Sequence, residues 1–295
     1  MPKTERWQWY VEEFSRTEQH HHAIEELYYS GRSNFQQIAV LRSPVFGKML
    51  VLDGDTQSAQ ADERIYHEAL VHPALAAASD RREVLVLGGG EGATLREVLR
   101  CPDVARCTMV DIDALVVELS KTYLPEWSDG AFEDARARVV LGDALEFMRA
   151  HDERYGVILS DLTEPLDDSP SNPLFNDSVF SLIKSRLADG GVYALQASTG
   201  AAHNAALHCK MARTLRRHYA HVASFVTHVP AFDTEWAFLA CSDRVDVASV
   251  VPELIEAYCA RLRGESFFYD SITHRRLFAL PLYLRRMLSA GGDTF

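Results

Sequence analysis

Three glycines and an acid stand together where an apolar run gives way to a helical pattern. The segment from Val84 to Thr94 reads VLVLGGGEGAT, as expected for a strand, a glycine-rich turn and a helix start. Such a turn can hold a nucleotide or an anionic group on backbone N–H groups, and Gly88, Gly89 and Gly90 would allow close approach to the backbone. The order GGGEG, in place of GxGxxG, argues against a dinucleotide and suits an adenosyl sulfonium.

Two further acids follow apolar runs at the spacing of a nucleoside pocket. Asp111, in CTMVDID, follows the glycine turn by about 20 residues, the interval at which the second strand of a Rossmann-type sheet presents an acid to ribose hydroxyls. Asp143, in VVLGDAL, stands where a third strand would end and a helix begin. We therefore expect Asp111 to bind the ribose and Asp143 the adenine amino group, with Ile112 and Ala144 beside them.

The carboxylate of Glu91 favours one kind of donor. The tail of ordinary S-adenosylmethionine ends in a carboxylate as well as an ammonium. Two unit charges about 4 Å apart at a protein surface interact by roughly 4 kcal/mol before solvent compensation. Glu91 should therefore prefer a tail that is only positive. The alternative is a local structural role, because the dipole of a helix favours an acid at its N-terminus.

Acids and aromatic residues from three other segments could bind a flexible polycation. The apolar run YGVILSD ends at Asp161 and enters the acidic, proline-containing loop DLTEPLDDSPSNPLF. In such a site, carboxylates bind ammonium groups and aromatic or apolar walls contact the methylenes between them. The candidate residues besides Asp161 are Gln57, Tyr66, His67, Glu164, Phe232 and Glu235.

The elements that would position these residues follow an alternating pattern. From Glu83 to Cys241, apolar strand-like runs alternate with helical patterns. This alternation predicts an α/β fold with a largely parallel, doubly wound sheet and helices on both faces. Ligands of such sheets bind at the carboxyl ends of the strands, where the candidate acids stand.

The N-terminal part of the chain has a different rhythm. Residues 36–43 and 48–53 predict a small antiparallel sheet, followed by a helix over residues 63–78. We therefore expect an N-terminal β-sheet domain with its connecting helix over residues 1–80 and a Rossmann-like catalytic domain over residues 81–295.

Composition and charge exclude several classes of function. The formal net charge of −12 argues against nucleic acid and anionic membranes as partners. The opening MPKTERWQWY is no signal peptide and no run approaches about 18 apolar residues, so a cytoplasmic protein is expected. The five cysteines form no CxxC pair, and the consecutive His20, His21 and His22 point in different directions. No metal site is therefore expected.

With these residues assembled, the chain closely resembles the aminopropyltransferases of the spermidine/spermine synthase family. The similar segments lie in the family's order between Met49 and Pro165. They are MLVLDGDTQSAQADERIYHEALVHPAL, VLVLGGGEGATLREVLR, VDIDALVVELSKTYLP, GDALEFM and VILSDLTEP. Within the family, YHEALVHPAL, GGGEGA and THVPAFDTEWAF are most similar to the thermospermine synthase branch, in which the acceptor is spermidine rather than putrescine.

The resemblance implies a fold, ligands and an assembly. It implies a Rossmann-like, class I methyltransferase-type sheet of seven strands, a small N-terminal antiparallel β domain and a homodimer. It also implies decarboxylated S-adenosylmethionine as co-substrate, a polyamine as acceptor and no metal. Carried over by position, Gln36 and Asp111 would hold the ribose and methylthio group, Asp143 the adenine amine, and Glu91 with Asp161 the donor's ammonium. The residues that would face the reaction centre and the acceptor are Gln57, Tyr66 and Glu164.

Two positions depart from the family's pattern. The acidic motif after the fourth strand is Asp161-Leu162-Thr163-Glu164 instead of DxxD, and Phe232 lacks the hydroxyl that is typical of putrescine users. In the reaction that we expect, a neutral amine attacks the methylene beside the sulfonium in line and releases 5′-methylthioadenosine. Glu164 would be the base, with Tyr66 and Asp161 orienting the reacting groups.

Three other functions remain open from the sequence. They are a spermidine synthase that uses putrescine or another diamine, a small-molecule methyltransferase that uses S-adenosylmethionine on the same fold, and a catalytically silent polyamine or nucleoside-binding protein. A methyltransferase would bind the carboxylated donor at least as well as the decarboxylated one. A silent binder would form no methylthioadenosine with any amine.

Overall fold

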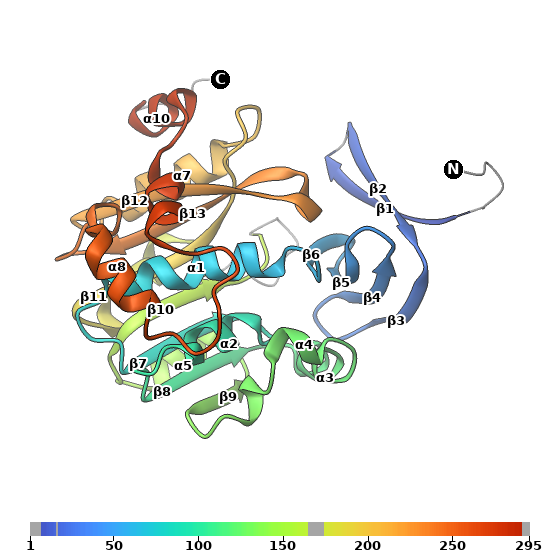
Figure 1. Cartoon of the computed structure of the whole chain (residues 1–295), viewed down its shortest axis with the longest axis horizontal. Helices are drawn as coiled ribbons and strands as arrows, with labels where there is room; N and C mark the ends of the chain where they lie inside the picture. The colour runs from blue at the N-terminus through green and yellow to red at the C-terminus, as the bar shows by residue number, and fades with distance from the viewer. Residues whose placement is uncertain (1–6, 16, 165–173, 291–295) are drawn as a thin grey trace.

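A large mixed sheet with helices on both faces and a group of N-terminal strands beside it make up the fold (Figure 1). The computed structural model describes residues 7–15, 17–164 and 174–290. The large sheet has seven strands in the order β12-β13-β11-β10-β7-β8-β9. Their bounds are Glu83–Gly88 (β7), Arg106–Asp111 (β8), Ala137–Leu141 (β9), Tyr155–Asp161 (β10), Leu187–Thr199 (β11), His221–Val229 (β12) and Thr234–Ser242 (β13). The predicted seven-stranded Rossmann-like sheet is confirmed.

The strand order of this sheet reverses at its middle. Strands β7 to β11 pair in parallel, whereas β13 is antiparallel to both of its neighbours, β11 and β12. From β7, the chain first adds β8 and β9 on one side and then returns to add β10 on the other. Connections therefore diverge between the carboxyl ends of β7 and β10, which is where sheets of this kind bind ligands.

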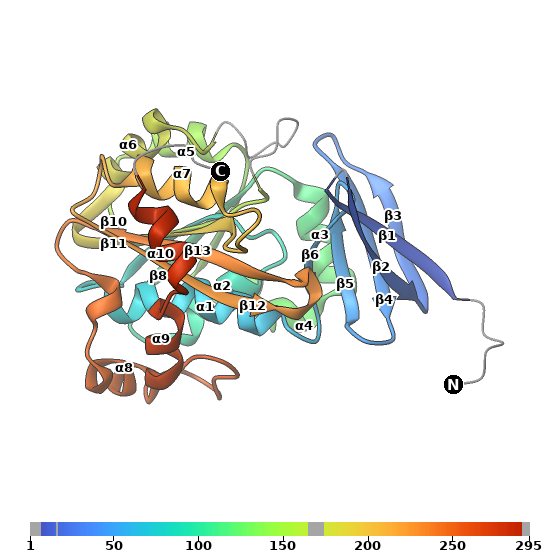
Figure 2. The same ribbon diagram turned by 90° about the horizontal axis from the view of Figure 1, so that it is seen from above.

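Helices cover both faces because the strands are apolar on both faces. In β7, Val84 and Val86 belong to one buried core and Leu85 and Leu87 to the other, as the alternation of side chains along a strand requires. Figure 2 shows the two helical layers on either side of the sheet. The first core includes residues of α1 (Glu63–Ala77), α2 (Ala93–Arg100), α8 (Pro252–Cys259) and α9 (Ser271–Phe278). The second includes residues of α5 (Ala144–Ala150), α6 (Asp177–Arg186), α7 (Ala206–Leu215) and α10 (Leu282–Ser289).

The N-terminal strands form a four-stranded antiparallel sheet and a separate hairpin. The sheet has the order β3-β4-β5-β6, with bounds Glu26–Arg32, Gln37–Ser43, Gly47–Leu52 and Asp55–Ala59. The hairpin pairs β1 (Gln8–Ser15) with β2 (Glu18–Ile24). A third core joins this sheet to α3 (Ala114–Tyr123) and α4 (Pro125–Ser128). The predicted small antiparallel sheet is confirmed, and the strands β3 and β6 and the separate hairpin are additions to the two strands predicted.

The helices of the described residues are all too short or too polar to cross a membrane.

Candidate active site

The glycine turn lets the end of β10 lie against the end of β7. Gly88 pairs with Asp161, so the last residues of the two strands are in register. A Cβ atom on Gly88 would lie 2.2 Å from the Asp161 carbonyl oxygen, which accepts a hydrogen bond from the Gly89 N–H at 2.9 Å. Gly88 also has a φ of +81°, which favours glycine. The glycines thus allow the Asp161 backbone to reach the turn.

A pocket lies where the connections of β7 and β10 diverge, between the carboxyl ends of the strands of the large sheet and the N-terminal strands. All the predicted donor-binding residues line it: Gln36, Gly88, Gly89, Gly90, Glu91, Asp111, Ile112, Asp143, Ala144 and Asp161. Gln57 and Tyr66 line the same pocket. The structure therefore brings these residues together, and their roles toward a ligand stay predictions.

Asp111 lies directly against the glycine turn. A Cβ atom on Gly90 would lie 2.7 Å from Asp111 Oδ2, and Oδ1 accepts from the Asp113 N–H at 2.8 Å. Burial raises the pKa of Asp111 to about 6, although N–H donors from Asp113 and Gly90 oppose the rise. Gln36 donates its amide N–H to Asp113 at 2.9 Å, which leaves its amide oxygen for a ligand.

Asp143 caps the helix that starts after β9. One of its carboxylate oxygens, Oδ1, accepts from the N–H groups of Leu145 and Glu146 at 2.6 and 3.1 Å. The start of α5 thus fixes the carboxylate beside the pocket, as an aspartate at a helix N-cap does. The other oxygen, Oδ2, is left to accept a hydrogen bond from a ligand amine.

Asp161 is held by two hydroxyl groups. Tyr66 donates its phenol to Oδ1 at 2.8 Å and Thr94 donates to Oδ2 at 2.6 Å. Burial raises the pKa of the Tyr66 phenol well above its usual value, and the charges of Asp161, Glu91 and Glu164 raise it further. The phenol therefore stays a hydrogen-bond donor. Thr94, at the start of α2, was not expected to contribute, and only its place three residues after Glu91 could have suggested it.

Glu91 is buried and bonded at both carboxylate oxygens. Ser58 donates to Oε2 at 2.8 Å, and His67 Nε2 lies 2.7 Å from Oε1. Ser58 itself accepts from the Trp127 indole N–H at 2.8 Å. Glu91 therefore reaches the pocket in a fixed orientation. His67 does not line the pocket, because its ring is turned toward Glu91 and the helix behind it.

Glu164, the candidate base, does not line the pocket itself. Burial raises the pKa of Glu164, and a hydrogen bond from Ser198 opposes the rise. Burial, followed by the charges of Glu12 and Glu164, raises the pKa of Asp55 to about 6. Glu164 thus lies near both Asp55 and Tyr66. The rest of its loop, residues 165–173, is outside the described residues.

Phe232 and Glu235 stand outside the lining of the pocket. The Phe232 ring packs edge-on against Tyr66, with ring centroids 6.1 Å apart. Asp62 accepts from the Ala231 N–H at 2.6 Å and so holds this turn against the start of α1. Glu235 directly precedes Trp236 on β13, so these two side chains point to opposite faces of the sheet. Its charge adds to burial in raising the pKa of the Tyr283 phenol.

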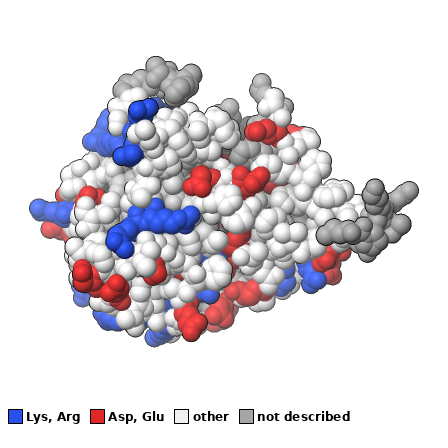
Figure 3. All heavy atoms as spheres, turned by 45° about the horizontal axis from the view of Figure 1, so that its top comes forward, with Lys and Arg blue, Asp and Glu red and all other residues white. Residues whose placement is uncertain are grey.

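All the charged residues in the described lining of the pocket are acidic. Its described lining contains four carboxylates, Glu91, Asp111, Asp143 and Asp161, and no Lys, Arg or His. On the face shown in Figure 3, acidic side chains lie in the middle of the molecule and along its lower edge, and basic ones are most concentrated in its left half. No group of three or more His, Cys, Asp or Glu in the described residues has the arrangement of a metal site.

The fold is a Rossmann-like α/β fold of the class I methyltransferase type, and the charged residues that line its pocket are all acidic in the described part of the chain. Residues 63–249 match the spermine/spermidine synthase domain, and residues 8–60 match the spermidine synthase tetramerisation domain. The chain therefore belongs to the spermine/spermidine synthase family, and it is an enzyme of aminopropyl transfer.

Individual relatives agree with this assignment. The chain is 39% identical to the polyamine aminopropyltransferase of Sulfolobus acidocaldarius over 96% of its own length and 93% of the relative's. It is 42% identical to that of Aeropyrum pernix over 82% of its own length and 77% of the relative's. A structure of spermidine synthase in complex with the transition state analogue AdoDATO has a TM-score of 0.89 and 26% identity, with 96% of each chain covered.

Proposed function

We propose that this enzyme transfers the aminopropyl group of decarboxylated S-adenosylmethionine to a polyamine, with spermidine as the favoured acceptor, and releases 5′-methylthioadenosine. The observation that carries the proposal is the pocket lining, in which four carboxylates occur without a basic side chain among the described residues. Such a lining stabilises a ligand that is positive at both its sulfonium and its amine. It offers no charged partner to the carboxylate of ordinary S-adenosylmethionine.

The contacts of the pocket residues support a partner for each end of the donor. Asp111 would bind the ribose hydroxyls and the free Oδ2 of Asp143 the adenine amine. Glu91 and Asp161, both fixed by hydrogen bonds at both oxygens, would bind the aminopropyl ammonium. Because these acids are oriented before the ligand arrives, little reorganisation is needed on binding.

In the reaction step, a neutral amine nitrogen attacks the methylene beside the sulfonium. The new C–N bond forms as the C–S bond breaks, and the C–S electron pair stays on the sulfur of methylthioadenosine. The proton that the attacking ammonium must lose passes to a carboxylate, for which Glu164 is the candidate. Its raised pKa suits a base that works near neutral pH.

Two residues near Tyr66 and Glu164 favour spermidine over putrescine as the acceptor. Phe232 presents an apolar ring there instead of a hydroxyl, and Asp55 adds a further carboxylate near Glu164. A longer acceptor with an additional ammonium would use both. Putrescine or another diamine is the second candidate, because the first amine-binding groups would serve either acceptor.

The assembly belongs to the proposal as well. A homodimer was expected, and the match of residues 8–60 to a tetramerisation domain supports an oligomer, either that dimer or a pair of dimers. A cytoplasmic location stays a prediction from the sequence.

A product assay tests the proposal. Purified protein is mixed with decarboxylated S-adenosylmethionine and, separately, putrescine, cadaverine, spermidine or spermine, and products are measured by mass spectrometry. Methylthioadenosine formed with spermidine and scarcely with putrescine is the expected result. A preference for a diamine would overturn the acceptor assignment, and no product with any amine would overturn the proposed donor chemistry.

A further inference from the structure

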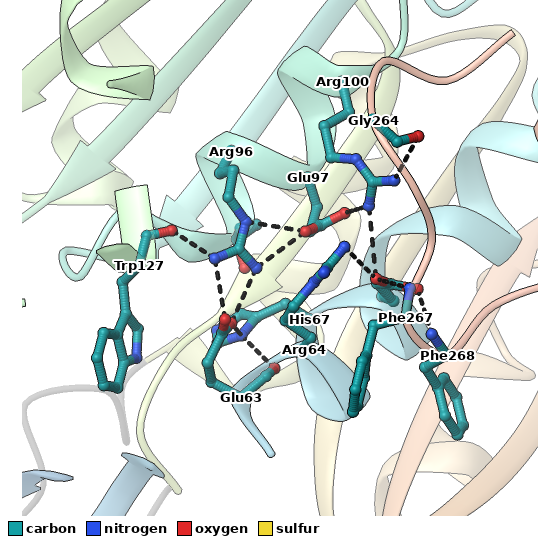
Figure 4. A network of polar contacts seen from close by, with 12 residues as sticks. Glu63, Arg64, His67, Arg96, Glu97, Arg100, Trp127, Gly264, Phe267 and Phe268 are labelled. Atoms are coloured by element: carbon teal, nitrogen blue, oxygen red, sulfur yellow. Dashed lines mark hydrogen bonds and ion pairs between the residues drawn. The ribbon is translucent and has the colours of Figure 1, made fainter. Parts of the chain in front are cut away.

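A chain of buried charges leads from the pocket into the contact between α1 and α2. We call the four residues Glu91, His67, Glu63 and Arg96 the charge chain. Figure 4 shows its outer part, with Arg96 reaching across to Glu63 and the His67 ring beside them. All four side chains are buried, with exposed fractions of 7%, 1%, 7% and 9% in that order. Only its first member, Glu91, lines the pocket.

The two nitrogens of the His67 ring face acceptors on opposite sides. Nδ1 lies 2.6 Å from the Glu63 carbonyl oxygen and 3.0 Å from Glu63 Oε2. Nε2 lies 2.7 Å from Glu91 Oε1 and 4.0 Å from Asp161 Oδ2. A neutral imidazole carries one N–H and could donate to one side only, whereas an imidazolium donates to both. The geometry therefore requires a protonated ring while both carboxylates are ionised.

Arg96 keeps the far carboxylate ionised. Its guanidinium makes a two-pronged contact with Glu63, Nη1 to Oε1 at 3.0 Å and Nη2 to Oε2 at 2.9 Å. The same guanidinium donates to the Trp127 carbonyl at 2.7 Å and to Glu97 at 2.9 Å. Burial alone would raise the pKa of Glu63, but His67 and Arg96 lower it. Glu63 is thus a permanent anion behind the ring.

We propose that Glu63 and Arg96 are positioning residues of the aminopropyl transfer: they keep His67 protonated, and His67 then donates to the Glu91 carboxylate and keeps it aimed at the donor's ammonium. The inference rests on the proposed function, because it takes the donor's ammonium as the ligand of Glu91. It assigns His67 an indirect role, since both ring nitrogens already contact carboxylates and neither is left for an amine.

The need for a cation at this point follows from the surrounding acids. The groups that face His67 are Glu63, Asp62 and Tyr66 from around α1, Glu91 from the turn before α2, and Asp161 from the end of β10. Without a cation among them, these like charges would repel one another, and Glu91 would lose the hydrogen-bond donor that fixes its orientation. Although burial favours the neutral ring, Glu63 and Glu91 raise the pKa of His67 well above its usual value.

The sign of the pH effect follows from these contacts. In the wild type, His67 stays protonated through neutral pH, so donor binding should persist well above the ordinary imidazole pKa of about 6.5. In Glu63→Gln, the ring loses one of its two anionic partners and deprotonates at a lower pH. A neutral ring with its N–H on Nδ1 turns a lone pair toward Glu91, so the carboxylate loses its hydrogen bond and its fixed orientation.

The test is the dissociation constant of decarboxylated S-adenosylmethionine, measured by calorimetry from pH 6 to pH 9 without an acceptor. The dissociation constant of Glu63→Gln should be within a few-fold of the wild-type value at pH 6. Above the lowered pKa of the His67 ring, the affinity should then fall by about tenfold per pH unit. Glu97→Gln is the matched control, because it removes another buried carboxylate from the same arginine without touching His67. It should keep the wild-type pH dependence.

Two outcomes would overturn the inference. One is a Glu63→Gln curve that follows the wild type up to pH 9, and the other is an equal shift in Glu97→Gln, which would indicate a general loss of packing. Should Glu63→Gln fail to fold, ¹⁵N NMR of the wild-type ring decides, with its signals assigned by their loss in His67→Gln. Protonation of both nitrogens at pH 8 supports the inference, and a neutral ring contradicts it. If the wild type does not bind the donor at all, the proposed function fails, and the NMR result still tests the charge state.

Discussion

At the level of single residues, the acids of the pocket differ in the hydrogen bonds that their carboxylate oxygens already make. Asp161 and Glu91 each have both oxygens bonded, whereas Asp143 uses one oxygen for a helix cap and leaves the other open. The first pair therefore presents oriented charge, and Asp143 presents a single acceptor atom. These environments suit an ammonium at one end of the pocket and an adenine amine at the other.

Matched amide substitutions should separate the two ends. Asp161→Asn should lower kcat/KM by about 10²- to 10⁴-fold, because the charge and the acceptor beside the reacting atoms are lost. Its affinity for methylthioadenosine, which has no aminopropyl tail, should be unchanged. Asp143→Asn should do the reverse, weakening methylthioadenosine binding and leaving kcat largely intact. Wild-type turnover in Asp161→Asn, measured with the true acceptor, would remove Asp161 from the reaction.

Asp111 should give donor binding an acid limb. Its pKa is raised to about 6, so the carboxyl is protonated below that pH and ionised above it. Only the ionised form would accept from both ribose hydroxyls in the proposed binding mode, and methylthioadenosine affinity should therefore fall as the pH drops through 6. Asp111→Asn should bind more weakly at pH 8 and lose this dependence. If the affinity of Asp111→Asn for methylthioadenosine still falls below pH 6 as in the wild type, another group causes the fall.

At the level of elements, the site depends on how closely the turn after β7 fits its neighbours. Gly90 illustrates this, because a Cβ atom there would lie 2.7 Å from Asp111 Oδ2. The matched comparison is Gly142, beside Asp143, where an added Cβ atom meets nothing within 4 Å.

Gly90→Ala should therefore displace the Asp111 carboxylate and weaken methylthioadenosine binding at least about tenfold, which corresponds to about 1.4 kcal/mol. Gly142→Ala should bind normally. Calorimetry on both variants, with thermal unfolding as the check on folding, makes the comparison. Equal affinities would show that the turn has more room than the structure gives it.

The sequence predicted those elements that consist of an apolar run with a characteristic residue directly after it. The ends of β7, β8 and β10 were found in this way, because an acid or glycine directly follows each apolar run. The hairpin of β1 and β2 was not, since EQHHHAI carries a polar run in place of an alternating apolar pattern. Its stability comes instead from contacts such as Glu12 with the Thr56 N–H at 2.8 Å, which a sequence pattern does not reveal.

The same distinction applies within the site. Glu91, Asp111, Asp143 and Asp161 carry their own signal, because they are charged residues at the end of an apolar strand or in the turn that follows one. Ser58 and Thr94 are small and common, and the topology alone brings them onto Glu91 and Asp161. The place of His67 behind the pocket also depends on which way α1 faces, and its neighbours in the sequence do not fix that.

At the level of the whole molecule, the outer face of the hairpin is unusually apolar. Trp9 and Val11 alternate with Tyr10 and Glu12, and they are 55% and 41% exposed. Leu27, at the start of β3, is also 55% exposed. Large apolar side chains exposed on a surface are typical of contacts between subunits, which agrees with the match of residues 8–60 to a tetramerisation domain.

Trp9→Lys should therefore shift the protein toward smaller assemblies in analytical ultracentrifugation at micromolar concentration, judged against the chain mass of 33.1 kDa. Leu254→Lys on α8 is the control, because Leu254 is equally exposed, at 60%, and α8 lies at the other end of the molecule from β1 (Figure 2). A Trp9→Lys variant with the wild-type mass distribution would exclude this face from the assembly.

The acidic pocket at the carboxyl ends of β7 and β10 should select a donor with a purely cationic tail. The most direct measurement is calorimetry of the wild-type enzyme with S-adenosylmethionine and with its decarboxylated form, which differ by one carboxylate. We expect the decarboxylated donor to bind at least about tenfold more tightly, a difference of about 1.4 kcal/mol. Equal affinities, or tighter binding of the carboxylated donor, would contradict the claim.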